Sequence, residues 1–207
     1  EQGWRDFQPV VLPTEARVAA MLEGTRHAAD EVVGRLRPTV YREFWEFTVE
    51  KVAVNAVMAG ARPEYLPVLL AMAASGLTGR SSSTTSQATV ALVNGPIRDE
   101  IGMNSGIGAM GPYNHANAAI GRAFGLLSQN LQGGSVPHES YMGSQGNFLS
   151  YNATFAENER ASPWEPFHVQ HGFAPEDSTV SLFLGGWYTI FGGGPRQCIG
   201  NSFAQME

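Results

Sequence analysis

Ala88-Thr-Val-Ala-Leu-Val93 is followed directly by the turn-forming residues Asn94-Gly95-Pro96. A short apolar run that ends at such residues is typical of a buried strand. The residues before it have the periodicity of helices, so the chain begins as helix and then becomes mixed. These features predict an α+β (or layered α/β) fold in which helices from the N-terminal half pack on a small mixed sheet.

Three helical segments are expected before this strand. Residues 14 to 36 are predicted as one helix or two, beginning at the capping residue Thr14 and ending before Pro38. A second helix is expected over residues 47 to 59. A third is expected over residues 63 to 74, because proline is favoured at the first position of a helix.

The second half alternates between irregular and regular segments. A helix is predicted over residues 118 to 131, with Asn114 or Asn117 as its N-cap. Residues 132 to 177 contain many turn formers and are predicted to be ordered loops, and residues 178 to 184 form a second strand. No linker divides the chain, so residues 1 to 207 are expected to form a single domain.

Composition restricts the possible functions. The 207 residues are 43% hydrophobic, which is enough for a sizeable core. The net charge is −6, and the 13 basic residues are spread singly, which argues against a nucleic-acid surface. No apolar stretch is long enough to cross a membrane, and no signal segment is recognised. The single cysteine allows no internal disulfide, and we expect a cytoplasmic location.

Lys51 is the only lysine, whereas arginine occurs at twelve positions. Lysine can lose its proton in a dry site and act as a base or nucleophile, which arginine cannot do. On a helix Lys51 and Asn55 share a face, so both are candidate site residues. The alternative is a solvated lysine on the surface of a helix.

Arg62 precedes Pro63-Glu64-Tyr65 at a junction between two expected helices. A guanidinium there could bind an anion or a carboxylate. The alternative is an ion pair from Arg62 to Glu64 or Glu50 that fastens the junction. The helix dipole alone accounts for Glu64 in a first turn.

A glycine-rich passage, residues 104 to 117, leads into the helix that ends its first turns at Gly121-Arg122. Its backbone amides could hold a phosphate or a carboxylate, with His115 as acid or base and with Asn114, Asn117 and Arg122 nearby. The spacing matches neither G-x-G-x-x-G nor a P-loop. The alternative is a long capping loop.

His168 and His171 are separated by two residues and lie between Pro166 and Gly172. This context favours an extended segment, in which the two imidazoles would point to opposite faces. We therefore predict no metal site. His168 is instead predicted to be a buried, hydrogen-bonded residue beside Trp164.

The tail contains the only cysteine, within Phe191-Gly-Gly-Gly-Pro-Arg-Gln-Cys-Ile-Gly200. This stretch resembles the haem-thiolate loop of the cytochromes P450. The resemblance implies that Cys198 would ligate haem iron and that Arg196 would pair with a propionate. That family also carries a Glu-x-x-Arg pair on a helix; Glu157-Asn-Glu-Arg160 matches it by letter, but the following Ser162-Pro163 makes us interpret the match as accidental.

The body, from about residue 14 to 184, resembles the C-terminal half of the UGSC-like (selenocysteine-Gly-Ser-Cys) thiol or selenol redox proteins. The resemblance rests on a few long motifs: Thr48-Val-Glu-Lys-Val-Ala-Val-Asn-Ala-Val-Met-Ala-Gly60, Arg62-Pro-Glu-Tyr-Leu-Pro67, Ile120-Gly-Arg122 and Ser162-Pro-Trp-Glu-Pro166. The chain departs from that family in lacking Cys-Gly-Ser-Cys and in carrying Ala61 where the family is expected to have a cysteine.

This resemblance implies an enzyme subunit that binds a small anionic or thiol substrate, and an oligomer is expected. Either the redox cysteines are supplied by a partner polypeptide, or this member has changed its chemistry. The candidate catalytic residues are Lys51, Tyr65 and His115; the candidate binding residues are Asn55, Arg62, Glu64, Asn114, Asn117 and Arg122. We expect these side chains to converge on one cavity that leaves Cys198 outside. Haem-thiolate binding and a non-catalytic interaction module are the alternatives.

Overall fold

A computed structural model of the chain describes residues 8–36, 45–77, 87–111, 113–131 and 152–186. Helices and a small mixed sheet make up this part of the protein, which confirms the predicted α+β class. Within the described residues, no helix combines the length and the apolar character that crossing a bilayer requires.

The first helix is much shorter than predicted. Helix α1, Glu15–Leu22, begins at Thr14, whose hydroxyl oxygen accepts a hydrogen bond from the backbone N–H of Arg17 at 3.4 Å. The rest of the predicted segment instead contains strand β1, Val32–Leu36, which pairs antiparallel with β2, Trp45–Thr48. Gly34 faces the ring of Phe47 so closely that a Cβ atom would lie 2.2 Å from it. The helix prediction over residues 32 to 36 was therefore wrong.

The next two helices follow the sequence pattern. Helix α2 is Val49–Met58; residues 47 and 48, predicted as helix, belong to β2, and Thr48 is the N-cap. A 3₁₀ turn, η1, covers Pro63–Tyr65 and runs into α3, Leu66–Ala74. Six of the nine residues of α3 are buried, which accounts for its almost uniformly apolar sequence.

The three-stranded sheet has the order β4-β3-β5. The predicted strand is β3, Gln87–Asn94, and the second predicted strand is β5, Thr179–Gly186, which runs antiparallel to it. Strand β4, Asn152–Ala156, runs parallel to β3 on the other side. It lies inside the region predicted to be loops, so that prediction was wrong for residues 152 to 156.

Three more helices follow β3 or β4. The short α4 is Ile97–Glu100, and the long α5, His115–Leu131, begins three residues earlier than predicted. Asn114 is its N-cap, because its side-chain oxygen accepts a hydrogen bond from the backbone N–H of Asn117 at 3.0 Å. The short α6, Phe167–Gln170, corrects the extended conformation predicted around the two histidines.

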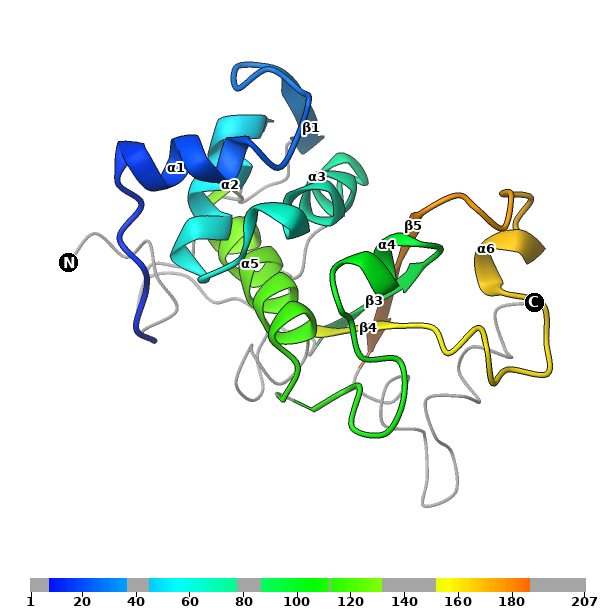
Figure 1. Ribbon diagram of the computed structural model, residues 1–207. Helices are drawn as coiled ribbons and strands as arrows, with labels where there is room; N and C mark the ends of the chain where they lie inside the picture. The colour runs from blue at the N-terminus through cyan, green and yellow to red at the C-terminus, as the bar shows by residue number, and fades with distance from the viewer. Residues whose placement is uncertain (1–7, 37–44, 78–86, 112, 132–151, 187–207) are drawn as a thin grey trace.

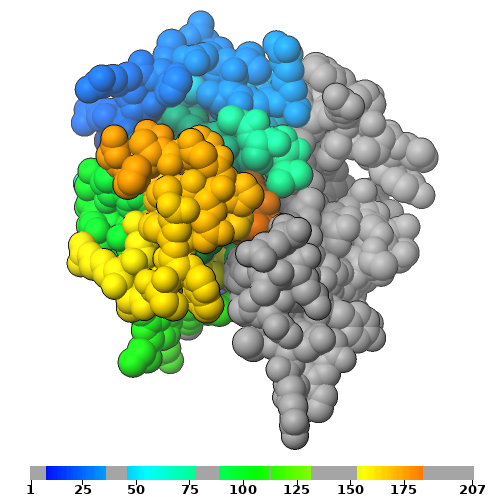
Figure 2. All heavy atoms as spheres, turned by 90° about the vertical axis from the view of Figure 1, so that its right-hand side faces the viewer, coloured from blue at the N-terminus to red at the C-terminus, as the bar shows by residue number. Residues whose placement is uncertain are grey.

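Helices α2, α3 and α5 pack on one another, and α5 also contacts β4 (Figure 1). Their shared core contains the side chains with the least exposure, among them Phe124, Leu66, Leu69, Met72, Ile120 and Leu126. The segment from β3 through α5 to β4 is thus a crossover connection between two parallel strands. The carboxyl ends of β3 and β4 therefore lie at the same edge of the sheet. Residues 157–178, which follow β4, lie on the face of the molecule shown in Figure 2, in yellow and orange.

Candidate functional site

Two of the three predicted catalytic residues meet, although fifty positions separate them in the sequence. The hydroxyl oxygen of Tyr65 lies 3.1 Å from Nδ1 of His115, and the two rings are tilted at 48°. Tyr65 is only 3% exposed at the end of η1, whereas His115 is the exposed first residue of α5. The hydroxyl group of the buried Tyr65 thus contacts the imidazole of His115, which is accessible to a small molecule from the solvent.

Asn114 and Asn117 hold the start of α5 in place. The side-chain amide of Asn114 donates to the carbonyl of Gly102 at 2.9 Å. Asn117 is 3% exposed and forms hydrogen bonds in both directions with the backbone of Asn104, and it also donates to the carbonyl of Ala109. These two residues therefore position the glycine-rich passage and the helix start rather than facing a ligand.

Arg62 and Glu64 both lie shortly before Tyr65 in the sequence, and both are exposed. Arg62 forms an ion pair with neither Glu64 nor Glu50, so the fastening pair considered from the sequence is not formed with either described residue. The backbone carbonyl of Arg62 accepts a hydrogen bond from the N–H of Tyr65 at 3.0 Å. Arg62 thus directly precedes the 3₁₀ turn η1, which contains Tyr65.

Lys51 and Asn55 lie at the opposite end of α5 from His115. The side-chain oxygen of Asn55 accepts a hydrogen bond from the amide of Asn130 at 2.6 Å. The fifteen residue-to-residue steps from position 115 to position 130 of α5 span about 22 Å of helix. The side chain of Lys51 is exposed, and its ammonium group lies 3.4 Å from the carbonyl oxygen of Glu46. The candidate residues therefore do not all converge on one cavity, and that prediction was wrong.

Arg122 lies two turns along α5 from His115, and its guanidinium donates to the carbonyl of Pro9 at 2.7 Å. A surface pocket of about 430 Å³ lies elsewhere and is lined by none of the predicted residues; its lining is Glu23, Gly24, Thr25, Arg26, His27 and Pro67. Cys198 and Arg196 fall outside the described residues, so haem ligation by the tail stays a prediction.

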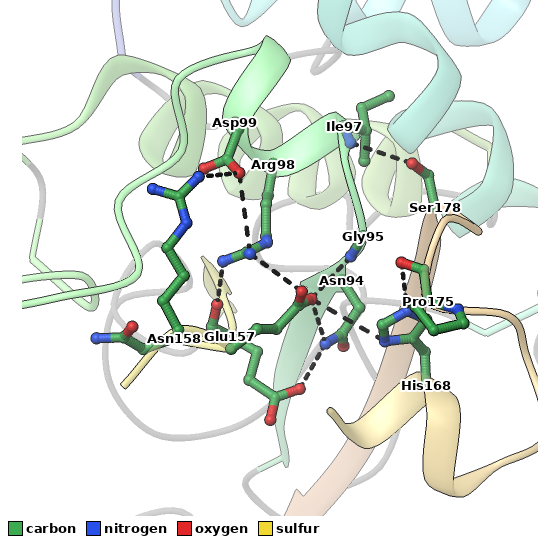
Figure 3. A network of polar contacts seen from close by, with 12 residues as sticks. Asn94, Gly95, Ile97, Arg98, Asp99, Glu157, Asn158, His168, Pro175 and Ser178 are labelled. Carbon is green, nitrogen blue, oxygen red and sulfur yellow. Dashed lines mark hydrogen bonds and ion pairs between the residues drawn. The ribbon is translucent and has the colours of Figure 1, made fainter. Parts of the chain in front are cut away.

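A second polar cluster occupies the carboxyl ends of the parallel strands (Figure 3). Glu159 receives hydrogen bonds from the side chain of Asn94 at 3.0 Å and from the N–H of Gly95 at 2.8 Å, and it forms an ion pair with Arg98 at 3.0 Å. The side chain of Arg98 is 8% exposed and also donates to the backbone carbonyl of Glu157. The buried guanidinium of Arg98 thus has a carboxylate partner.

The cluster continues into α6 and to the surface. Glu157 accepts hydrogen bonds from the side chain of Asn94 and from the N–H of Phe167. Arg160 pairs with Asp99 at 2.9 Å on the exposed side. Glu157-Asn-Glu-Arg160 therefore does have a structural role, although in a turn rather than on the helix that the haem-protein motif needs.

His168 is 1% exposed, so its predicted burial is confirmed. Its Nε2 lies 3.4 Å from the carbonyl oxygen of Pro175, and its Nδ1 lies 4.0 Å from the carboxylate of Glu159. Trp164, by contrast, is 75% exposed. No group of three or more His, Cys, Asp or Glu side chains in the described part of the chain is arranged to hold a metal ion.

Sequence reasoning missed this cluster because strand β4 was not recognised. Two signals pointed toward it: Asn94 follows a buried strand, and Glu157 and Glu159 follow a run of small and β-branched residues. Parallel strands place such residues at one edge of a sheet, which is where ligands bind in open α/β sheets.

The chain has no match in the comparisons with known proteins: no family, no curated protein and no solved structure matches it.

Proposed function

We propose that this chain is the substrate-activating subunit of a thiol redox enzyme, and that it binds a small anionic thiol beside Tyr65 and His115. The observation that carries the proposal is the 3.1 Å contact between the Tyr65 hydroxyl and Nδ1 of His115. A hydroxyl with a buried ring holds the imidazole in one orientation, which general acid–base catalysis requires.

The proposed step is removal of a thiol proton. With its hydrogen on Nδ1, the neutral ring of His115 donates to the Tyr65 oxygen and keeps a lone pair on Nε2. The S–H bond of the substrate breaks, its proton moves to Nε2, and a thiolate and an imidazolium result. The Tyr65 oxygen still accepts from Nδ1–H after the transfer, so the charged ring keeps its partner.

Two features near the pair favour an anionic substrate. His115 is the first residue of a 17-residue helix, and the first N–H groups of a helix carry partial positive charge. The exposed Arg62, three residues before Tyr65, supplies a full positive charge with no Glu50 or Glu64 partner. A carboxylate on the substrate would interact with both.

The redox step itself is assigned to a partner polypeptide, as the UGSC-like resemblance implies. The thiolate would attack a disulfide on that partner: a mixed disulfide forms, and one partner cysteine leaves as thiolate. The partner disulfide is then the oxidant, and this chain contributes substrate binding and proton transfer.

Binding of mercaptoacetate, a small thiol carboxylate, tests the proposal. Histidine side-chain resonances are followed by NMR while mercaptoacetate is added. We expect the His115 resonances to move and saturate, while those of His27, which is exposed and paired with Glu31, stay in place. Tyr65→Phe keeps the ring but loses the hydroxyl, and it should weaken binding roughly three- to tenfold.

Two further variants separate the candidate residues. Arg62→Met should weaken mercaptoacetate binding roughly two- to fivefold, which is the range of an exposed charge interaction. Lys51→Met is the matched control and should leave the dissociation constant unchanged, because Lys51 lies at the other end of α5. Equal shifts at every histidine, or a loss of binding in the Lys51 variant alone, would contradict the proposal. Acetate and 2-mercaptoethanol as separate probes show whether the carboxylate or the thiol is recognised.

A further inference from the structure

The cluster at the carboxyl ends of β3 and β4 contains two buried polar atoms without a hydrogen-bond partner. They are Oδ1 of Asn94, a residue with 0% exposure, and Nδ1 of His168, a residue with 1% exposure. Most buried polar atoms in proteins have a partner, and each exception calls for an explanation. The two side chains face one another in Figure 3.

The orientation of the Asn94 amide is set by its neighbours. Its Nδ2 contacts carboxylate oxygens of both Glu157 and Glu159, and a carboxylate oxygen can only accept hydrogen bonds. The nitrogen must therefore be on that side, and Oδ1 faces away from the carboxylates as an acceptor.

The tautomer of His168 follows from the same reasoning. Its Nε2 faces the carbonyl oxygen of Pro175 at 3.4 Å, and a carbonyl can only accept, so Nε2 carries the hydrogen. In the neutral ring Nδ1 is then an acceptor, and it lies 4.0 Å from the Glu159 carboxylate. Two acceptors without a partner, Oδ1 of Asn94 and Nδ1 of His168, thus lie in the same cluster as the Glu159 carboxylate.

The charges of the cluster favour a cation beside these acceptors. Three carboxylates and two guanidiniums leave one negative charge in excess when His168 is neutral; these groups are Asp99, Glu157, Glu159, Arg98 and Arg160. Asp99 and Arg160 are exposed and pair with each other, so the excess lies on Glu157 and Glu159, and Glu159 is only 13% exposed. An excess charge away from water is costly unless a counter-charge accompanies it.

We propose that Asn94, His168 and Glu159 form a binding site for a small protonated nitrogen, with the ammonium ion as its simplest occupant. An ammonium nitrogen donates hydrogen bonds of about 2.9 Å, and two such bonds can span acceptors 4.0 Å apart. Occupation satisfies both unpartnered atoms and cancels the excess charge. The site would also fasten α6, which carries His168, to the ends of β3 and β4.

Thermal unfolding with ammonium chloride as the probe tests this site. At fixed pH and ionic strength, ammonium chloride is exchanged for tetramethylammonium chloride, whose cation has the same charge but no N–H group. We expect ammonium alone to raise the Tm saturably, by roughly 2–4 °C at about five times its dissociation constant. His168→Leu should abolish the rise. His171→Leu is the matched control, because the exposed His171 packs on Phe167 and has no contact with the carboxylates.

A measurement on the unaltered protein covers the case in which the His168 variant does not fold. The ¹⁵N chemical shift of His168 Nδ1 distinguishes a protonated nitrogen from a nitrogen that accepts a hydrogen bond. The site is supported if the ¹⁵N chemical shift of Nδ1 is that of an acceptor and changes saturably with ammonium but not with tetramethylammonium. A protonated Nδ1 without ammonium would show that a proton on His168 supplies the missing charge, and an acceptor shift indifferent to ammonium would show a bound water. Either result overturns the proposal.

Discussion

At the scale of single residues, the Tyr65–His115 contact shows what sequence reasoning can and cannot supply. Both residue types suggest proton chemistry; His115 was a candidate from its glycine-rich context, and Tyr65 was one through the UGSC-like resemblance. Their pairing was not predictable, because it depends on how η1 docks against the start of α5. Lys51 was a candidate because it is the only lysine and shares a helix face with Asn55, and neither feature says where that face lies relative to the other candidates.

Two glycines provide a prediction at this scale. Gly95 and Gly102 both have positive φ, of 82° and 66°. A Cβ atom on Gly95 would lie 2.1 Å from the backbone carbonyl oxygen of Asp177, whereas one on Gly102 would meet nothing within 4 Å. We expect Gly102→Ala to lower the free energy of unfolding by about 1–2 kcal/mol, the cost of the left-handed backbone. Gly95→Ala should cost roughly 2–3 kcal/mol more, because the turn after β3 must move from the Asp177 backbone. Urea unfolding measures both, and equal losses would show that this close approach is absent in solution.

At the scale of elements, helices and strands were predictable where local signals agreed with packing. Strand β3 and helices α3 and α5 have strong apolar patterns and clear end signals, and all three were found. Strand β1 was mistaken for helix because its residues follow a helical pattern without a strong break, and its conformation is set by pairing with β2. Strand β4 was missed because it is five residues long and depends on β3 for its hydrogen bonds.

The junction of β2 and α2 allows a test at this scale. Thr48 ends the strand and caps the helix, and its hydroxyl accepts a hydrogen bond from the N–H of Lys51 at 3.4 Å. Thr48→Ala should lower the free energy of unfolding by about 1 kcal/mol, because one N–H group of the first turn loses its partner. Thr48→Ser keeps the hydroxyl and should recover most of that loss in the same denaturation experiment. If the serine variant were as unstable as the alanine variant, the methyl group rather than the cap would be the stabilising part.

At the scale of the whole molecule, the sequence predicted the class of fold and the packing of N-terminal helices on a sheet, but not where functional groups meet. Helix α5 separates two polar regions: the Tyr65–His115 pair lies at its start, and Asn55 lies near its end. The third region, around Glu159, depends on the crossover that makes β3 and β4 parallel. All three arise from long-range packing, which residue patterns along the chain do not encode.

The packing of the helices also bears on the haem resemblance of the tail. A haem-thiolate site needs apolar surface on both faces of the porphyrin. Helices α2, α3 and α5 bury their apolar sides in one shared core, so those sides are not free to cover a haem. We therefore expect that the protein, mixed with one equivalent of haemin, reduced and exposed to carbon monoxide, gives no thiolate-type shift of the Soret band. The Cys198→Ser variant should give the same spectrum as the unaltered chain. A shifted band that disappears in the variant would instead make haem binding through Cys198 the better account of this protein, and the thiol proposal would have to give way to it.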